Sequence, residues 1–109
     1  MERLLEQGRH GHFFAELSRI VKVYLGGRYR VELIERTSSE VPAVLEQART
    51  PASTIEETSG LLDLADRVKF AGDRPDPEIC LRAFETAYAI VDATKPREEP
   101  ELAGERGVA

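Results

Sequence analysis

Residues 61–71 read LLDLADRVKFA, and this stretch decides the fold. Side chains advance by about 100° per residue around an α-helix, so positions three or four apart share a face. The apolar side chains gather on one face: Leu61, Leu62, Leu64, Ala65, Val68 and Ala71. The charged side chains of Asp63, Asp66 and Arg67 fall on the other. The pattern predicts an amphipathic helix whose apolar stripe is broad enough to contact more than one neighbour.

Sequence signals frame this helix at both ends. The S/T-x-x-E spacing of a capping box occurs twice before it, as Ser53 with Glu56 and as Thr54 with Glu57. Gly72 follows it and readily adopts the left-handed conformation that ends helices. We therefore expect a helix over residues 55–71, with the other elements arranged around it.

Phe70 is the one side chain of this stretch that does not fit the stripe, because it projects opposite the apolar face. We expect the turn over residues 72–75 to fold back over the ring, with the Lys69 stem along the apolar edge. In the alternative, Phe70 stays exposed for a partner. Lys69, Phe70, Leu81 and Tyr88 are then the candidate interaction residues.

Length and composition indicate one soluble globular domain with a modest core. The chain has 109 residues, of which 41% are hydrophobic and 32% charged. Residues 1–36 carry seven basic and five acidic side chains (+2), and residues 37–109 carry eight and fifteen (−7), giving −5 overall. An acidic body argues against nucleic acid as a partner. The single cysteine, Cys80, favours a reducing compartment, and no apolar run is long enough to span a membrane.

The N-terminal part predicts a lead-in followed by a helix. Two glycines between positions 8 and 11 make residues 1–11 a linker. Apolar side chains at helical spacing then predict a helix over residues 12–25: Phe13, Leu17, Ile20, Val21 and Tyr24. We expect Gly26 and Gly27 to end this helix.

The middle of the chain changes period. Residues 28–36 alternate between apolar and charged side chains, and with no partner strand in the sequence we expect an extended segment laid across the helices. A helix is predicted over residues 38–49, where Thr37 and Glu40 form another capping-box pair. Pro42 is compatible only with the first turn of that helix.

The last helix has the strongest start signal, with Asp76 as cap and Pro77 at the first helical position. We expect it to reach about residue 94. Its predicted apolar face comprises Ile79, Cys80, Ala83, Phe84, Ala87, Ile90 and Val91. Residues 97–109 are rich in charge, Pro and Gly, which predicts a flexible tail after a helical domain over residues 12–96.

Chemical motifs are weak in this sequence. His10, His12 and Glu16 are conceivable metal ligands, but no third His or Cys lies within reach, so we favour a solvated terminus. The aspartates near the last two helices are interpreted as a solvated face and a cap. Cys80 is expected to be an inert core thiol. We predict no catalytic residue, no metal site and no cofactor.

Basic residues 19, 22, 28, 30 and 36 surround Tyr29 and raise the alternative of a nucleic-acid-binding helical domain. Glu32 and Glu35 interrupt this group, and no recognition-helix pattern accompanies it. We therefore favour a solvated surface, or a face toward acidic lipid or protein. The third alternative, a small enzyme, has no nucleophile or phosphate-loop motif to support it.

Three short motifs give the chain a family resemblance. F-[FY]-x-x-L-S corresponds to Phe13 through Ser18, T-[ST]-x-E to Thr37 through Glu40, and A-D-x-V-K-F-A to Ala65 through Ala71. In this order they resemble the C-terminal cytoplasmic domain of BatD-type (oxygen-tolerance) bacterial membrane-anchored proteins and a related uncharacterised family. The glycine pair and Pro42 depart from that pattern.

The resemblance implies a scaffold or adaptor on the cytoplasmic face of the bacterial inner membrane, with no enzymatic residues to carry over. Genes of such proteins typically neighbour those of MoxR-type AAA ATPases and von Willebrand factor A-type proteins, which are then the expected protein partners. A membrane helix would lie outside this chain. We predict an all-α domain, an irregular four-helix bundle with one extended crossing segment, acting as a non-catalytic protein-interaction module.

Overall fold

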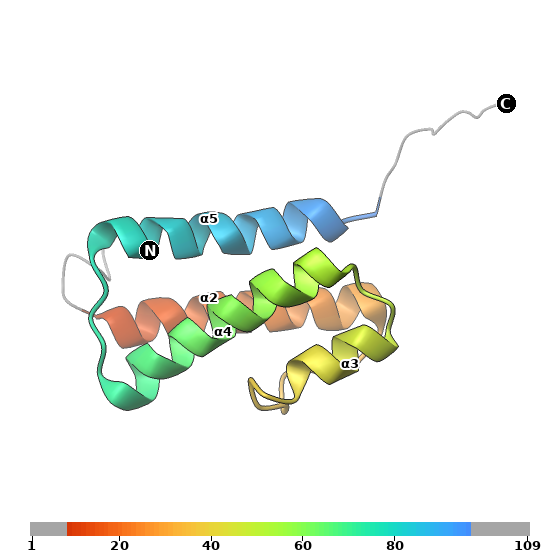
Figure 1. Cartoon of the computed structure of the whole chain (residues 1–109), viewed down its shortest axis with the longest axis horizontal. Helices are drawn as coiled ribbons and strands as arrows, with labels where there is room; N and C mark the ends of the chain where they lie inside the picture. The colour runs from red at the N-terminus through yellow and green to blue at the C-terminus, as the bar shows by residue number, and fades with distance from the viewer. Residues whose placement is uncertain (1–8, 97–109) are drawn as a thin grey trace, which may run out of the picture.

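The computed structural model describes residues 9–96, and these form an all-α bundle of four helices, as predicted. The helices are α2 (His10–Tyr29), α3 (Val41–Gln47), α4 (Ala52–Ala71) and α5 (Pro77–Thr94). Figure 1 shows α2 and α5 running in the same direction, with α4 antiparallel to both and the short α3 below it. Residues 1–8 of the predicted 1–11 lead-in and the predicted tail at residues 97–109 lie outside the described residues, and α2 begins at His10, two residues before the predicted start.

The helix that contains residues 61–71 organises the bundle, as its broad stripe predicts. α4 packs against each of the other three helices. Its buried side chains are Thr54, Thr58, Leu61, Leu62, Ala65 and Val68. The four apolar ones, Leu61, Leu62, Ala65 and Val68, join one core cluster with buried residues of α2, α3 and α5, in which Phe13 and Phe14 at the start of α2 are the fully packed aromatic side chains among the described residues. Phe13 and Phe14 meet there edge to face, with ring centroids 5.2 Å apart.

α4 ends where the sequence predicts, but it begins three residues before the predicted start at residue 55. Gly72 has φ 75° and donates its backbone N–H to the Arg67 carbonyl, which is the predicted left-handed stop. The helix begins at Ala52, after Pro51, and no side chain caps it. The predicted capping boxes are therefore wrong here, because Pro51 fixes an earlier start and Thr54 turns into the core instead.

The prediction that Gly26 and Gly27 end the first helix is also wrong. α2 continues through both glycines to Tyr29, and the left-handed residue is Arg30, with φ 58°. The Arg30 and Val31 backbone N–H groups both donate to the Gly26 carbonyl, the latter at 3.0 Å. The weak helix propensity of glycine, about 1 kcal/mol each, is outweighed where the helix on both sides is packed on the core.

The segment after α2 is irregular, and no strand occurs within residues 9–96. Leu33 is buried in the core, so the segment inserts an apolar side chain as expected. Lys22 Nζ on α2 donates to the Arg36 carbonyl at 2.8 Å and holds the segment against the helix. The Thr37 N–H donates to Glu40 Oε1 at 3.0 Å, which is half of the predicted capping box.

α5 begins where predicted, with Asp76 at the N-cap position and Pro77 next. Its predicted apolar face is too broad, because Ile79 is 40% and Phe84 45% exposed. The buried stripe consists mainly of small side chains that let α5 lie close to its neighbours: Cys80, Ala83, Ala87, Ile90 and Thr94. Within residues 9–96, no helix is both long and apolar enough to cross a membrane.

Candidate functional site

Phe70 is exposed, and the expectation that the following turn covers it is wrong. It is 75% exposed, the highest value among the large apolar residues of positions 9–96. The turn between Gly72 and the start of α5 therefore does not cover the ring. Lys69 extends its amine to 5.3 Å from the ring centroid, a cation–π distance.

The four candidate interaction residues lie on two surfaces. Lys69 and Phe70 are neighbours on α4, whereas Leu81 and Tyr88 lie on α5, 55% and 68% exposed. Leu64 lines the groove between α4 and α5. Phe70 follows it by six residues, which turns its side chain about 120° away from that groove. The structure therefore brings Lys69 and Phe70 together and separates them from the other two.

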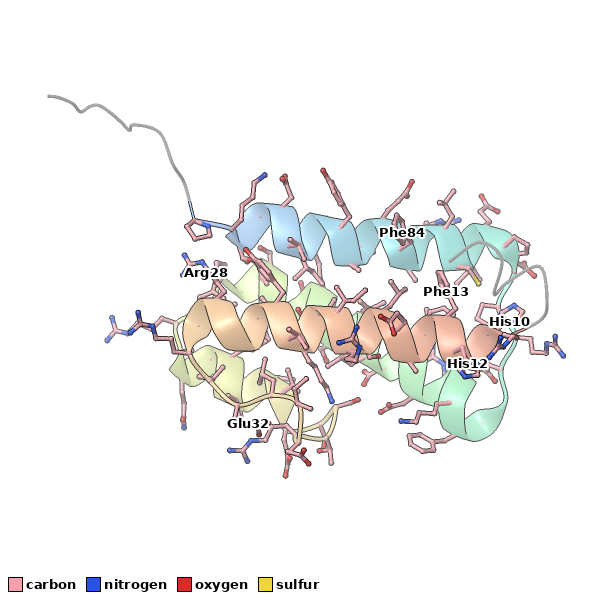
Figure 2. All side chains as sticks on the ribbon, turned by 180° about the vertical axis from the view of Figure 1, so that it is seen from behind. His10, His12, Phe13, Arg28, Glu32 and Phe84 are labelled. Atoms are coloured by element: carbon pink, nitrogen blue, oxygen red, sulfur yellow. The ribbon has the colours of Figure 1, made fainter. Side chains whose placement is uncertain are left out.

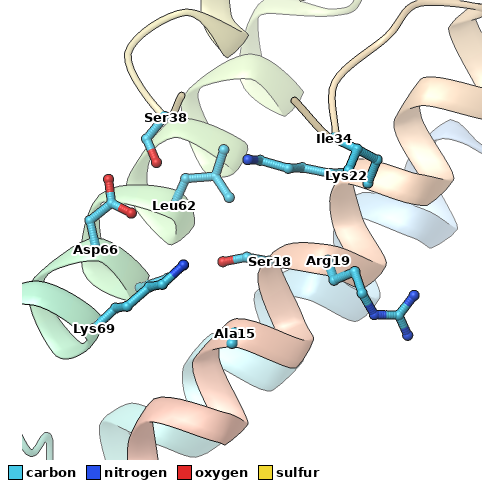
Figure 3. A pocket seen from close by; sticks show the side chains of 10 residues that line it. Ala15, Ser18, Arg19, Lys22, Ile34, Ser38, Leu62, Asp66 and Lys69 are labelled. Carbon is cyan, nitrogen blue, oxygen red and sulfur yellow. The ribbon is translucent and has the colours of Figure 1, made fainter. Parts of the chain in front are cut away.

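Lys69 also lines a pocket between α2 and α4 of about 170 Å³, closed on one side by the segment after α2. Figure 3 shows polar side chains around it, with the Leu62 side chain between them. The polar side chains that line it include Ser18, Lys22, Ser38, Asp66 and Lys69. Two ammonium groups, two hydroxyls and one carboxylate thus border a single small hollow.

The three motifs behind the family resemblance meet at this pocket. Ser18 ends the first motif, Ser38 belongs to the second, and Asp66 and Lys69 belong to the third. These motifs are far apart in the chain and are joined in space by the packing of α4 on α2. Of these four pocket residues, only Lys69 is a candidate interaction residue from the sequence, and the shared membership of the three motifs is the signal that would have found Ser18, Ser38 and Asp66.

Only some of the charged side chains around the pocket form an ion pair with another described residue. Arg19, on the rim, is held by Glu16 at 2.7 Å, and this hydrogen bond lowers the pKa of Glu16 and raises that of Arg19. Lys22, Asp66 and Lys69 form no ion pair with another described residue. The pocket therefore carries two unneutralised ammonium groups and one carboxylate.

A second hollow lies between α4 and α5, about 300 Å³ in volume and more open to solvent. Glu56, Glu57 and Arg82 surround its apolar floor of Leu61, Leu64 and Ile79. Phe84, labelled on α5 in Figure 2, is another exposed apolar side chain. None of the residues that line this hollow belongs to the three motifs, and neither does Phe84.

The residues that line the pocket between α2 and α4 include no cysteine or histidine. Cys80 is buried, as predicted, and burial raises the pKa of its thiol, with Sγ 3.7 Å from the Pro75 carbonyl oxygen. His12 Nδ1 is contacted by the Arg9 guanidinium at 3.0 Å. No group of three His, Cys, Asp or Glu side chains in the described part of the chain is arranged to hold a metal ion.

Comparison of the chain with protein-family models, curated proteins and solved structures finds no match. The resemblance to BatD-type domains rests on the three motifs alone and stays a prediction.

Proposed function

We propose that this domain is a non-catalytic protein-interaction module whose recognition surface consists of Phe70, Lys69 and the pocket between α2 and α4. The observation that carries this proposal is the exposure of the Phe70 ring directly beside the pocket. Protein interfaces typically have an aromatic side chain at their centre, next to polar groups that lose their water when the partner binds. Phenylalanine is among the residue types most often buried, so a ring that is 75% exposed is an uncommon use of this residue.

The motif resemblance supports a more specific proposal about the setting. The domain would be the cytoplasmic part of a membrane-anchored bacterial protein of the BatD type, tethered through a segment absent from this chain. Its partners would be a MoxR-type AAA ATPase or a von Willebrand factor A-type protein. The domain would act as a scaffold or adaptor that holds such partners near the membrane.

A direct binding measurement tests this proposal. The immobilised domain is exposed in turn to the purified MoxR-type ATPase and von Willebrand factor A-type protein of the same host, followed by interferometry. Phe70→Ala should lower the affinity for one of them at least about tenfold, the scale of a hot-spot residue. Tyr88→Ala is the matched control, because it removes an aromatic ring of similar exposure from α5.

Binding that is lost with Tyr88→Ala and kept with Phe70→Ala would contradict the proposed surface. Failure of the wild-type domain to bind either protein would contradict the proposed partners. Circular dichroism of each variant confirms that the helical content is unchanged.

A further inference from the structure

We infer that the pocket between α2 and α4 binds one carboxylate side chain of a partner segment, with an apolar residue of that segment resting on Phe70. This inference rests on the proposed function and adds the chemistry of the partner. Its occupant is an acidic residue next to a large apolar one in a protein chain.

The size of the pocket favours a side-chain group over a free metabolite. Its volume of about 170 Å³ is below the range of about 300–1,000 Å³ typical of small-molecule sites. A single carboxylate with its methylene stem suits such a hollow, whereas a drug-sized ligand would remain largely outside it. The rest of the ligand must then lie on the surrounding surface, where Phe70 and Ile34 are exposed.

The polar groups favour an anion. Lys22 and Lys69 bring two ammonium groups to the hollow; Lys22 Nζ uses one of its three N–H donors on the Arg36 carbonyl, and neither group has a carboxylate within 4.0 Å among the described residues. The Ser18 and Ser38 hydroxyls point toward the same space in Figure 3 and make no hydrogen bond with another described residue. Ammonium and hydroxyl donors together match the acceptor oxygens of a carboxylate.

The charge balance favours a monoanion over a phosphate group. Two ammonium groups and the Asp66 carboxylate leave the pocket with a net charge of +1, since Arg19 is neutralised by Glu16. One carboxylate brings that sum to zero. A phosphorylated side chain carries about −1.5 to −2 and would leave excess negative charge beside Asp66.

Lys69 joins the polar pocket to the apolar contact. Its ammonium group lines the pocket and also lies 5.3 Å from the centroid of the Phe70 ring. A carboxylate bound by Lys69 is therefore next to the ring, and the neighbouring residue of the same segment reaches Phe70. Because the Lys69 ammonium group and the Phe70 ring are so close, the pocket and the ring together favour a partner segment in which an acidic residue is adjacent to an apolar one.

The test is a ¹⁵N NMR titration of the whole chain with the capped dipeptide acetyl-Glu-Leu-amide. We expect saturable shifts around residues 15–22, 34–38 and 62–70, with binding in roughly the millimolar range for so small a ligand. Acetyl-Gln-Leu-amide should bind at least about fivefold more weakly, and the phosphoserine analogue no more tightly than the glutamate peptide.

Three variants sharpen the test. Lys69→Gln should weaken the glutamate peptide at least about threefold, and Asp66→Asn should strengthen it, because a like charge is removed. Lys95→Gln is the matched control and should change nothing, since Lys95 lies at the end of α5 and pairs with Asp92 at 3.0 Å.

Several results overturn the inference. These are equal binding of the glutamine peptide, tighter binding of the phosphoserine peptide, equal losses for Lys95→Gln and Lys69→Gln, or no saturable shift up to about 20 mM peptide. If one of them appears while Phe70→Ala still abolishes partner binding, the carboxylate inference fails and the proposed function stands.

Discussion

The start of α2 and the end of α4 both carry phenylalanine, with opposite outcomes. Phe13 and Phe14 are buried, whereas Phe70 is 75% exposed. The start of α2 lies in the core cluster shared with α4 and α5, but Phe70 projects from the face of α4 opposite that cluster. The difference teaches that the neighbours of a helix face decide whether an aromatic residue is buried. An exposed one is then available for recognition.

Among the predictions, replacement of the buried Phe14 should cause the largest change in the free energy of unfolding. Phe14→Ala removes a fully buried ring and leaves a cavity, so we expect a loss of about 3–5 kcal/mol in the free energy of unfolding. Chemical denaturation measures this loss. A change below about 1 kcal/mol would mean that the start of α2 is not part of the core.

Gly26 and Gly27 of α2 should respond differently to replacement by alanine, because only Gly26 lies close to the chain that follows the helix. A Cβ on Gly26 would lie 2.9 Å from the Val31 carbonyl oxygen, so Gly26→Ala should destabilise by about 1–3 kcal/mol. Gly27→Ala meets nothing within 4 Å and should stabilise by about 0.5–1 kcal/mol through better helix propensity. Thermal unfolding of both variants provides the measurement. Equal effects would contradict the close approach after α2.

Gly72 tests whether the end of α4 needs its left-handed residue. Its φ of 75° is unfavourable for a residue with a Cβ, so Gly72→Ala should cost about 1–2 kcal/mol. No atom obstructs the added Cβ, so the expected loss is purely conformational. Gly72→Asn, which tolerates this conformation better, should recover part of the stability in the same denaturation assay. Identical losses for both variants would contradict this explanation.

Sequence periodicity predicts the four helices and the central place of α4, and the helix-end signals predict the Gly72 stop and the Asp76–Pro77 start. It failed where a tertiary contact outweighed local propensity. α2 passes through its glycines because Leu25 and Tyr29 pack on the core at either side. Helical spacing alone predicts that Phe84 is buried, yet α5 buries mainly small side chains and Phe84 is exposed.

The candidate site was predictable only in part. The off-stripe position of Phe70 could be recognised from helical spacing, but its exposure depends on the path of the chain after Gly72. The pocket was not predictable, because Ser18, Ser38 and Asp66 come from three elements. Their proximity results from the packing of α2 on α4 and from the anchor of Lys22 on the Arg36 carbonyl.

The most direct test of the central claim measures Phe70→Ala in two assays: unfolding by denaturant, and binding to the MoxR-type ATPase and the von Willebrand factor A-type protein of the same host. Because the ring is exposed, the free energy of unfolding should change by no more than about 0.5 kcal/mol. Partner affinity should fall at least about tenfold. Destabilisation of about 3 kcal/mol or more, or unchanged partner affinity, would contradict the claim that this aromatic residue serves recognition.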